Sequence, residues 1–320
     1  DHRKLHPSYN FDHLELSDEP GCYEDAYRSW VRKKAPEELD NVSLGLPPVT
    51  EKWQDCTGFI DGIKHPEQRH VMEARPFSGR SNLTHSAFVG EQTIEFLKKQ
   101  CEQPFFCFSG FYSPHSPWVV PQEFLDLYDE EDIPLPNFPA EFDRNCGEKL
   151  TDSELKSITK GYYAMISEVD HWVGIILETL EKMGIADNTI IVFTSDHGEW
   201  LGEHMRTGKG NWAPDVVSRV PMIIKVPEKL GGAVARQVSD IVECVDVVPT
   251  LLQLIGIPIP PEIQGNILPV TKNNDSYQGD NIGLTEHRGW KSMRTDNYRY
   301  IVDENGDEHL YDLQQDPWEY

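Results

Sequence analysis

The feature that most constrains the fold is a long helical pattern that leads into an apolar run and then into a polar cluster. Apolar residues recur at helical spacing over 158–180, and Thr151 and Glu154 before them have the spacing of a capping box. Gly184 stands where a left-handed C-cap is expected. The apolar run 189–194 follows and is typical of a buried strand. Polar residues at the carboxyl end of such a strand are where open α/β sheets place active sites.

Other segments continue the alternation of helices and strands. The spacing of apolar residues predicts a short helix over 24–34 and a longer one over 86–100. The wholly apolar run 105–111 predicts a strand buried on both faces of a parallel sheet. A further strand over 220–226 and a helix over 247–255 complete an α/β pattern. We therefore expect a mostly parallel sheet flanked by helices.

The composition of the sequence changes after residue 258, where prolines, glycines and asparagines, which interrupt helices and strands, predict a connecting loop. Beyond it, 298–302 and 308–313 have the character of strands around an Asn305-Gly306 turn, which is a good hairpin signal. The tail is predicted to be a small antiparallel subdomain. The predicted domains are an α/β domain, 1–268, and the start of an antiparallel β subdomain, 269–320.

Composition excludes several classes of function. The 320 residues contain 54 acidic and 29 basic side chains, which gives a net charge of -25. This balance argues against nucleic acid and anionic lipid as partners, because a basic surface supplies most of that binding. No apolar run reaches the roughly 18 residues that a membrane span needs, so none is predicted. The six cysteines form no CxxC pair and indicate neither a zinc site nor a disulfide framework. The sequence leaves the cellular compartment open.

Asp196 and His197 are the most informative pair in the polar cluster. A carboxylate and an imidazole on a loop after a strand can both face a divalent cation, which needs oxygen and nitrogen donors. Gly198 lets the backbone turn immediately after them. The alternative is structural: Asp196 caps the next turn and His197 packs locally, because short caps of this kind are common.

Two further side chains have the chemistry to bind an anionic ester. His115 lies between two prolines that stiffen its loop, which suits a group that must donate to a developing negative charge. Lys209 lies between two glycines, and its ammonium could reach an anionic oxygen of a substrate. The alternatives are a histidine in a surface turn and a solvated surface lysine. His115 and Asp196 would share one rim of the sheet if their strands are parallel.

At this point the sequence resembles a known family. The segments 194–199, 201–204 and 208–210 closely resemble the part of the sulfatase family, in the alkaline phosphatase superfamily, that carries two metal ligands and a sulfate-binding lysine. The resemblance extends over 85–320, and many ordered matches are far more specific than one motif. The other landmarks lie at 162–174, 187–189, 218–221, 246–252, 264–265, 294–300 and 310–317.

The resemblance implies roles for five residues. Asp196 and His197 become ligands of a divalent cation, usually calcium in this family and sometimes magnesium or manganese. Lys209 becomes a ligand of a sulfate oxygen. His115 becomes a donor to the sulfate or the ester oxygen and a candidate general acid. His204 is assigned to the surroundings of the substrate.

The sequence also departs from the family pattern. Catalysis in the family depends on a Cys or Ser in a C/S-x-P-x-R motif, which is converted to formylglycine and whose hydrated aldehyde attacks sulfur. No cysteine or serine in this chain begins such a motif. Lys4 and His6 have the spacing of the family's Gly-Lys-x-His segment but lack its glycine. We therefore expect the chain to be the middle and C-terminal part of a sulfatase-type hydrolase, truncated at both ends.

The resemblance implies hydrolysis of a small-molecule or carbohydrate sulfate ester by a metal and, in the complete protein, a formylglycine nucleophile. A first alternative is a phosphonate monoester or phosphodiester hydrolase, because the same superfamily site handles phosphoryl and sulfuryl groups. A second alternative is a non-catalytic remnant that binds an anionic ligand or a partner.

Overall fold

The computed structural model describes residues 10–45, 63–65, 72–100, 103–210, 214–232, 234–274, 276–287 and 289–320. Lys4 and His6, the candidate pair near the N-terminus, lie outside the described residues. The chain divides into two compact units, and each is described by itself. Unit 1 comprises Asp1–Leu135 and Leu150–Gly184, and unit 2 comprises Pro136–Lys149 and Ile185–Tyr320. The domain boundary between residues 268 and 269 stays a prediction.

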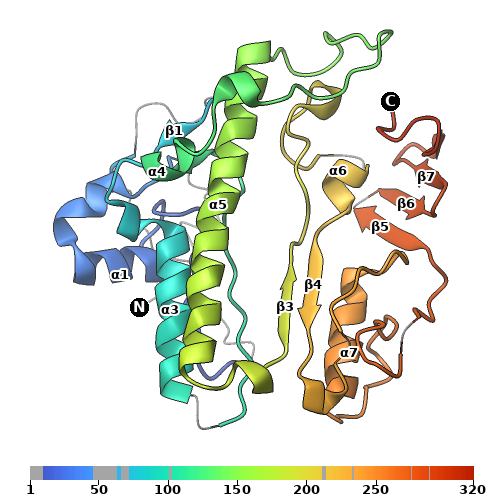
Figure 1. Cartoon of the computed structure of the whole chain (residues 1–320). Helices are drawn as coiled ribbons and strands as arrows, with labels where there is room; N and C mark the ends of the chain where they lie inside the picture. The colour runs from blue at the N-terminus through green and yellow to red at the C-terminus, as the bar shows by residue number, and fades with distance from the viewer. Residues whose placement is uncertain are drawn as a thin grey trace. The chain divides into compact units, whose positions relative to one another are not determined.

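Unit 1 is mainly helical. Its long helices α3 and α5 lie side by side (Figure 1), and strands β1 and β2 form a short parallel pair. The helices predicted over 24–34, 86–100 and 158–180 are confirmed. The elements are α1 (Ala26–Lys34), η2 (Pro36–Asn41), β1 (Arg75–Pro76), η3 (Ser81–Leu83), α3 (His85–Gln100), β2 (Val119–Val120), α4 (Gln122–Leu125), η4 (Glu130–Asp132) and α5 (Asp152–Lys182).

Helix α5 begins and ends where the sequence predicts. The Thr151 hydroxyl accepts a hydrogen bond from the Glu154 backbone N–H at 3.2 Å, and the Glu154 carboxylate accepts one from the Thr151 backbone N–H at 2.8 Å. This reciprocal capping box satisfies two N–H groups that the first turn leaves without partners. Gly184 follows the helix with φ of +69°, a left-handed conformation that glycine adopts without cost.

The core of unit 1 forms between α1, the first half of α3 and the segment after η2. Apolar side chains at helical spacing on α1 and α3 face each other there, and Trp30, Leu39, Phe77 and Phe111 pack around them. Burial of this apolar surface is the main source of stability for such a cluster. The buried members are Ala26, Tyr27, Val31, Val42, Phe88 and Val89.

The described residues of unit 2 form two sheets. Strands β3 and β4 pair antiparallel, and β5, β6, β7 and β8 form a four-stranded antiparallel sheet in that order. The predicted C-terminal hairpin is confirmed, with Gly306 at φ of +83° in its turn. The elements are η5 (Ala186–Asn188), β3 (Ile191–Thr194), η6 (Glu203–Met205), α6 (Asp215–Ser218), β4 (Met222–Lys225), η7 (Glu228–Leu230), η8 (Cys244–Asp246), α7 (Val247–Leu254), β5 (Gly283–His287), β6 (Trp290–Arg294), β7 (Tyr298–Val302) and β8 (Glu308–Asp312).

Two expectations about buried strands are wrong. Residues 105–111 form no strand, and the side chains of Phe106 and Phe108 are 64% and 79% exposed. An apolar run predicts burial only if neighbouring strands cover it, and no described strand pairs with this segment. Strand β3 exists, but Phe193 on it is 36% exposed. Its only ladder partner among the described residues is the antiparallel β4, and a two-stranded ribbon cannot bury both of its faces.

None of the helices in the described parts of the chain is long and apolar enough to cross a membrane.

Candidate active site

The loop 195–210, which we call the site loop, follows β3 and brings three of the predicted residues together. His197 lies at its centre: the Nε2 atom is 3.0 Å from the Lys209 Nζ atom and 3.6 Å from the Asp196 Oδ2 atom. The Asp196 side chain is 85% exposed, whereas that of His197 is 26% exposed. A carboxylate, an imidazole and an ammonium therefore converge at one solvent-accessible point.

The tautomer of His197 follows from its contacts. Its Nδ1 atom lies 2.7 Å from the Gly198 carbonyl oxygen, and a carbonyl can only accept, so Nδ1–H is the donor. In the neutral ring the Nε2 lone pair then faces Lys209 and Asp196. A histidine that binds a metal usually donates its other ring N–H to a carbonyl in this way, which fixes the ring and raises its basicity.

The side chains at this point have the right chemistry to bind a divalent cation, but they are too few to complete its coordination shell. Asp196 and His197 offer a carboxylate and an imidazole nitrogen. Within the residues that the structure describes, no group of three or more His, Cys, Asp or Glu side chains is arranged to hold a metal. Calcium takes six to eight oxygen ligands and magnesium six, so the two residues would have to be joined by others.

The two ends of the site loop are tied together by a buried carboxylate. Glu199, which is 9% exposed, accepts hydrogen bonds from the Gly208 and Leu201 backbone N–H groups. The Trp200 backbone N–H donates to the Gly208 carbonyl at 2.9 Å. Burial raises the pKa of Glu199, and the two backbone hydrogen bonds oppose that rise. Because Gly208 precedes Lys209, these contacts hold the lysine close to His197.

Gly198 fixes the site loop against α6. Its backbone N–H donates to the Val217 carbonyl at 2.6 Å, and a Cβ atom at this position would lie 2.1 Å from the Val216 carbonyl oxygen. A Cβ atom essentially never comes within 3.0 Å of a heavy atom outside its own residue and its two chain neighbours. The close approach of the two backbones therefore requires glycine.

We expect Gly198→Ala to destabilise the protein by about 1–3 kcal/mol, because the new methyl group overpacks rigid backbone. The measurement is the urea midpoint of unfolding. Gly174→Ala on α5 is the control, since nothing lies within 4 Å of the added Cβ there. It should leave stability unchanged or raise it, because alanine favours helix by about 1 kcal/mol over glycine. Equal behaviour of the two variants would contradict the close contact.

Helix α6 is itself held by a buried ion network. Asp215, its first residue, forms ion pairs with Arg299 of β7 and, at 3.2 Å, with Arg294 of β6. Its backbone N–H donates to the Glu319 carboxylate at 2.7 Å, and Arg299 pairs with Glu319 as well. The two arginines hold the pKa of Asp215 below its usual range against the opposing effect of burial. The four-stranded sheet is thus connected through α6 to Gly198.

His204 lies on the site loop but contacts the C-terminal residues. Its ring stacks on Tyr320 with centroids 4.0 Å apart, and its Nε2–H donates to the Trp318 carbonyl at 3.0 Å. The Tyr320 hydroxyl donates to the Glu203 carboxylate at 2.9 Å. Burial lowers the pKa of His204. These contacts favour a role in holding the loop, and substrate binding by His204 stays a prediction.

His115 belongs to unit 1, in the loop between α3 and β2. Its Nδ1 atom lies 2.7 Å from the Ser116 carbonyl oxygen and 2.9 Å from the Tyr112 hydroxyl, which itself donates to the same carbonyl at 2.8 Å. Since the carbonyl only accepts, Nδ1 carries a proton. Any proton that His115 exchanges with a substrate must then pass through Nε2.

Sequence reasoning missed the residues that support the site loop. Glu199 lies two residues after His197, but nothing in the sequence shows that its carboxylate is buried. Arg299 lies in the segment 294–300, which resembles the family, but the resemblance assigned no function to this arginine. Tyr320 gave no signal, because its partner His204 is 116 residues away.

Two family models match the chain. The sulfatase model matches residues 42–257, and the model described as N-sulphoglucosamine sulphohydrolase, C-terminal, matches residues 202–320. Among solved structures, the phosphonate monoester hydrolase of Agrobacterium radiobacter is similar with a TM-score of 0.74 at 23% identity, over 93% of this chain and 64% of that one. The fold is therefore that of the alkaline phosphatase superfamily, and the chain belongs to the sulfatase family.

Curated relatives agree with this assignment. An arylsulfatase of Clostridium perfringens is 30% identical over 92% of this chain and 60% of its own length. Arylsulfatase K of Rattus norvegicus is 31% identical over 87% of this chain and 56% of its own length. A structure solved in complex with its substrate D-glucosamine-2-N,6-O-disulfate is similar with a TM-score of 0.60 at 22% identity, over 73% of this chain and 64% of that one. The chain thus spans about 60% of the length of such relatives.

Proposed function

We propose that the protein is a sulfuric ester hydrolase and that the site loop binds the sulfate group and a divalent cation. The observation that carries the proposal is the convergence of Asp196 and Lys209 on His197, whose Nδ1–H is committed to a backbone carbonyl. Membership of the sulfatase family supports the same reaction class. The substrate is a small-molecule or carbohydrate sulfate ester, in keeping with the sulfated sugar bound by a structural neighbour.

Asp196 and His197 would hold the cation, which we propose to be calcium, with magnesium and manganese as alternatives. A bound divalent cation polarises the ester and stabilises the negative charge that develops on the sulfate oxygens. The carboxylate and the Nε2 lone pair of His197 suit such an ion in chemistry. Among the described residues, no third His, Cys, Asp or Glu side chain joins this pair. The remaining ligands of the cation must therefore be other groups.

The side chains of this chain would divide the work on the substrate. The Lys209 ammonium would bind a sulfate oxygen, since a charge-assisted hydrogen bond to an oxyanion is about twice as strong as one between neutral groups. His115 would give a proton from Nε2 to the leaving alcohol oxygen and must be an imidazolium to do so, because Nδ1–H donates to Ser116. We further propose that the attacking group is a formylglycine, as the family resemblance implies.

The test is sulfate release from an aryl sulfate by the full-length gene product. Asp196→Ala should lower kcat/KM by about 10²-fold or more, since loss of one preorganised electrostatic group has effects of this size. Asp187→Ala is the matched control, because that aspartate is fully exposed and precedes β3 at the other end. Unchanged activity in Asp196→Ala would overturn the assignment of the site.

Phosphonate monoester or phosphodiester hydrolysis is a second candidate. An ammonium, an imidazole and a carboxylate recognise the tetrahedral oxyanion that both ester classes share, so the site loop alone does not separate them. Turnover of matched aryl sulfate and aryl phosphonate esters decides between the two. Absence of turnover with both, together with retained sulfate binding, would favour the non-catalytic alternative.

A further inference from the structure

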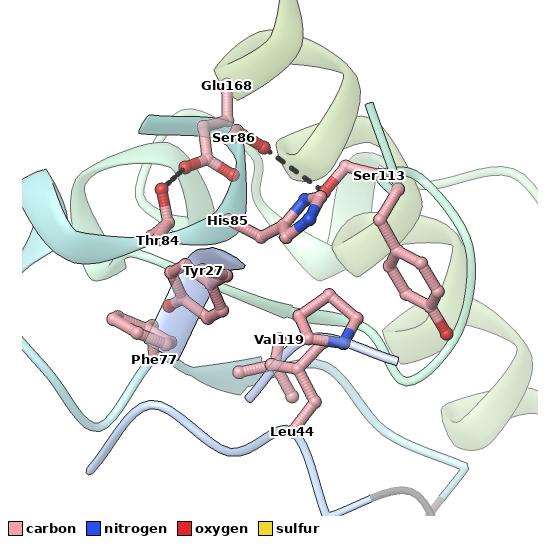
Figure 2. Close-up of a pocket in the computed structure, with 11 residues that line it drawn as sticks. Tyr27, Leu44, Phe77, Thr84, His85, Ser86, Ser113, Val119 and Glu168 are labelled. Atoms are coloured by element: carbon pink, nitrogen blue, oxygen red, sulfur yellow. Dashed lines mark hydrogen bonds between the residues drawn. The ribbon is translucent and has the colours of Figure 1, made fainter. Parts of the chain in front are cut away.

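Unit 1 contains a small pocket at the N-terminus of α3. Hydroxyl groups, an imidazole and a carboxyl group line it together with apolar side chains, and it has room for little more than one water molecule (Figure 2). The polar side chains come from α1, the first turn of α3, the loop before His115 and α5. They are Tyr27, Thr84, His85, Ser86, Tyr112, Ser113 and Glu168.

His85 is the member of the pocket whose hydrogen bonding is incomplete. The residue is partly buried, but both of its ring nitrogens are shielded from solvent, and neither has a hydrogen-bond partner among the described residues. The ring instead packs against the rings of Tyr27 and Phe88, at centroid distances of 5.4 and 5.7 Å. A neutral imidazole has one donor and one acceptor, and leaving both unmade in the interior is costly.

The neighbouring hydroxyl groups are only loosely satisfied by one another. The Ser86 and Ser113 hydroxyls lie 3.4 Å apart, which is long for a hydrogen bond between hydroxyls, and Ser86 also hydrogen-bonds to the Glu168 carboxyl. Thr84, in contrast, donates to Glu168 over a short contact and caps the Ala87 backbone N–H at 3.1 Å. The gap in the network thus lies at the His85 ring, which Figure 2 shows close to Ser86 and Ser113.

We infer that this pocket binds one ordered water molecule, which hydrogen-bonds to His85 and to the Ser86 or Ser113 hydroxyl. Buried waters make about three hydrogen bonds to polar groups that are otherwise unsatisfied, and a polar pocket of this size meets that need. The inference concerns a site outside the site loop and stands independently of the proposed hydrolase activity.

A neutral ligand fits better than an anion. The N-terminus of α3 would attract negative charge, but the Glu168 carboxyl lines the same pocket. Burial lowers the pKa of His85 to about 4, so no imidazolium is present at neutral pH to balance an anion. A sulfate or phosphate would also exceed the available space. Water satisfies the donor and the acceptor of a neutral imidazole without adding charge.

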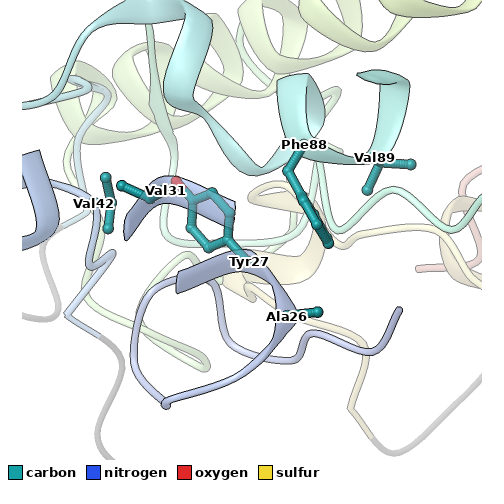
Figure 3. Packing of buried hydrophobic residues seen from close by; sticks show 6 residues of the cluster. All are labelled: Ala26, Tyr27, Val31, Val42, Phe88 and Val89. Atoms are coloured by element: carbon teal, nitrogen blue, oxygen red, sulfur yellow. The ribbon is translucent and has the colours of Figure 1, made fainter. Parts of the chain in front are cut away.

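The water would connect α3 to the loop that carries His115. Ser113 is two residues before His115, and the Tyr112 hydroxyl contacts His115 Nδ1 at 2.9 Å. On its other side the pocket borders the apolar cluster to which Tyr27, Val31 and Phe88 belong (Figure 3). The hydrated site therefore joins the rigid core of unit 1 to the start of this loop.

The test is a crystal structure of the chain at a resolution that shows ordered waters, with a second crystal soaked in bromide. Electron density for one water within hydrogen-bond distance of a His85 ring nitrogen and of the Ser86 or Ser113 hydroxyl is expected. An empty pocket would overturn the inference, and so would an anomalous bromide signal at the site, which would show that it takes halide.

His85→Phe gives a second measurement that does not depend on crystals. The phenyl ring has the shape of the imidazole but no nitrogen, so loss of the water's partner should lower the urea midpoint of unfolding. If the pocket is dry, removing two unsatisfied nitrogens should raise the midpoint instead. His171→Phe on α5 is the control, since that side chain is exposed and its ring lies against Phe124 and Trp172.

Discussion

Arg299→Ala is expected to lower the free energy of unfolding by about 3–5 kcal/mol, because it leaves the buried Glu319 carboxylate without its cation and removes one of the arginines that pair with Asp215. The side chains of Arg299 and Glu319 are 2% and 4% exposed, and Asp215 between them is 23% exposed. Arg299 also donates to the Ser292 hydroxyl at 2.9 Å. Urea unfolding followed by tryptophan fluorescence measures the effect.

Arg219→Ala is the matched control, because Arg219 also pairs with Asp215. Its closest contact is longer, at 3.8 Å, and its side chain is 77% exposed. Solvent screens such a pair, so the change should stay within about 0.5 kcal/mol. Equal destabilisation by the two substitutions would show that the buried network does not hold α6 as we describe.

Glu168→Gln is expected to stabilise the protein at alkaline pH. Burial raises the pKa of Glu168 from 4.5 to about 7, against the opposing hydrogen bonds from Thr84 and Ser86. Because the folded pKa is the higher one, the folded state binds more protons between those values, and stability falls as pH rises through that window. The loss amounts to about 3 kcal/mol above pH 7. Glutamine keeps the acceptor for Thr84 and does not ionise.

The measurement is the difference in free energy of unfolding between Glu168→Gln and the wild type at several pH values. This difference should grow from pH 4.5 to pH 7 and then stay level. Other titrating groups cancel in the difference if they lie outside the pocket. Glu178→Gln on the same helix is the control: its pairing with Lys182 lowers its pKa, so no change is expected in this window. A flat difference for Glu168→Gln would contradict a raised pKa.

The sequence predicts best those parts of the fold that local interactions determine. The capping box of Thr151 and Glu154 and the turn at Gly306 lie within a few residues of the elements that they define, and both form as predicted. The strand predicted over 105–111 fails because burial of an apolar run depends on strands elsewhere in the chain.

The candidate site shows the same division. Asp196, His197 and Lys209 lie within one short loop, so their convergence could be predicted from spacing and from family resemblance. The contacts that support this loop could not be predicted, because Arg299 and Asp215 are 84 residues apart in the sequence. The unsatisfied nitrogens of His85 are likewise a property of the packed core and leave no trace in the sequence.

The central claim is that the site loop binds a divalent cation through Asp196 and His197, and metal analysis tests it most directly. The full-length gene product, purified with calcium and then freed of loosely bound ions, should retain one equivalent of divalent cation. Asp196→Ala and His197→Ala should lose it, since each removes a ligand, while Asp187→Ala should retain it. Undiminished metal content and affinity in both site variants would contradict the account.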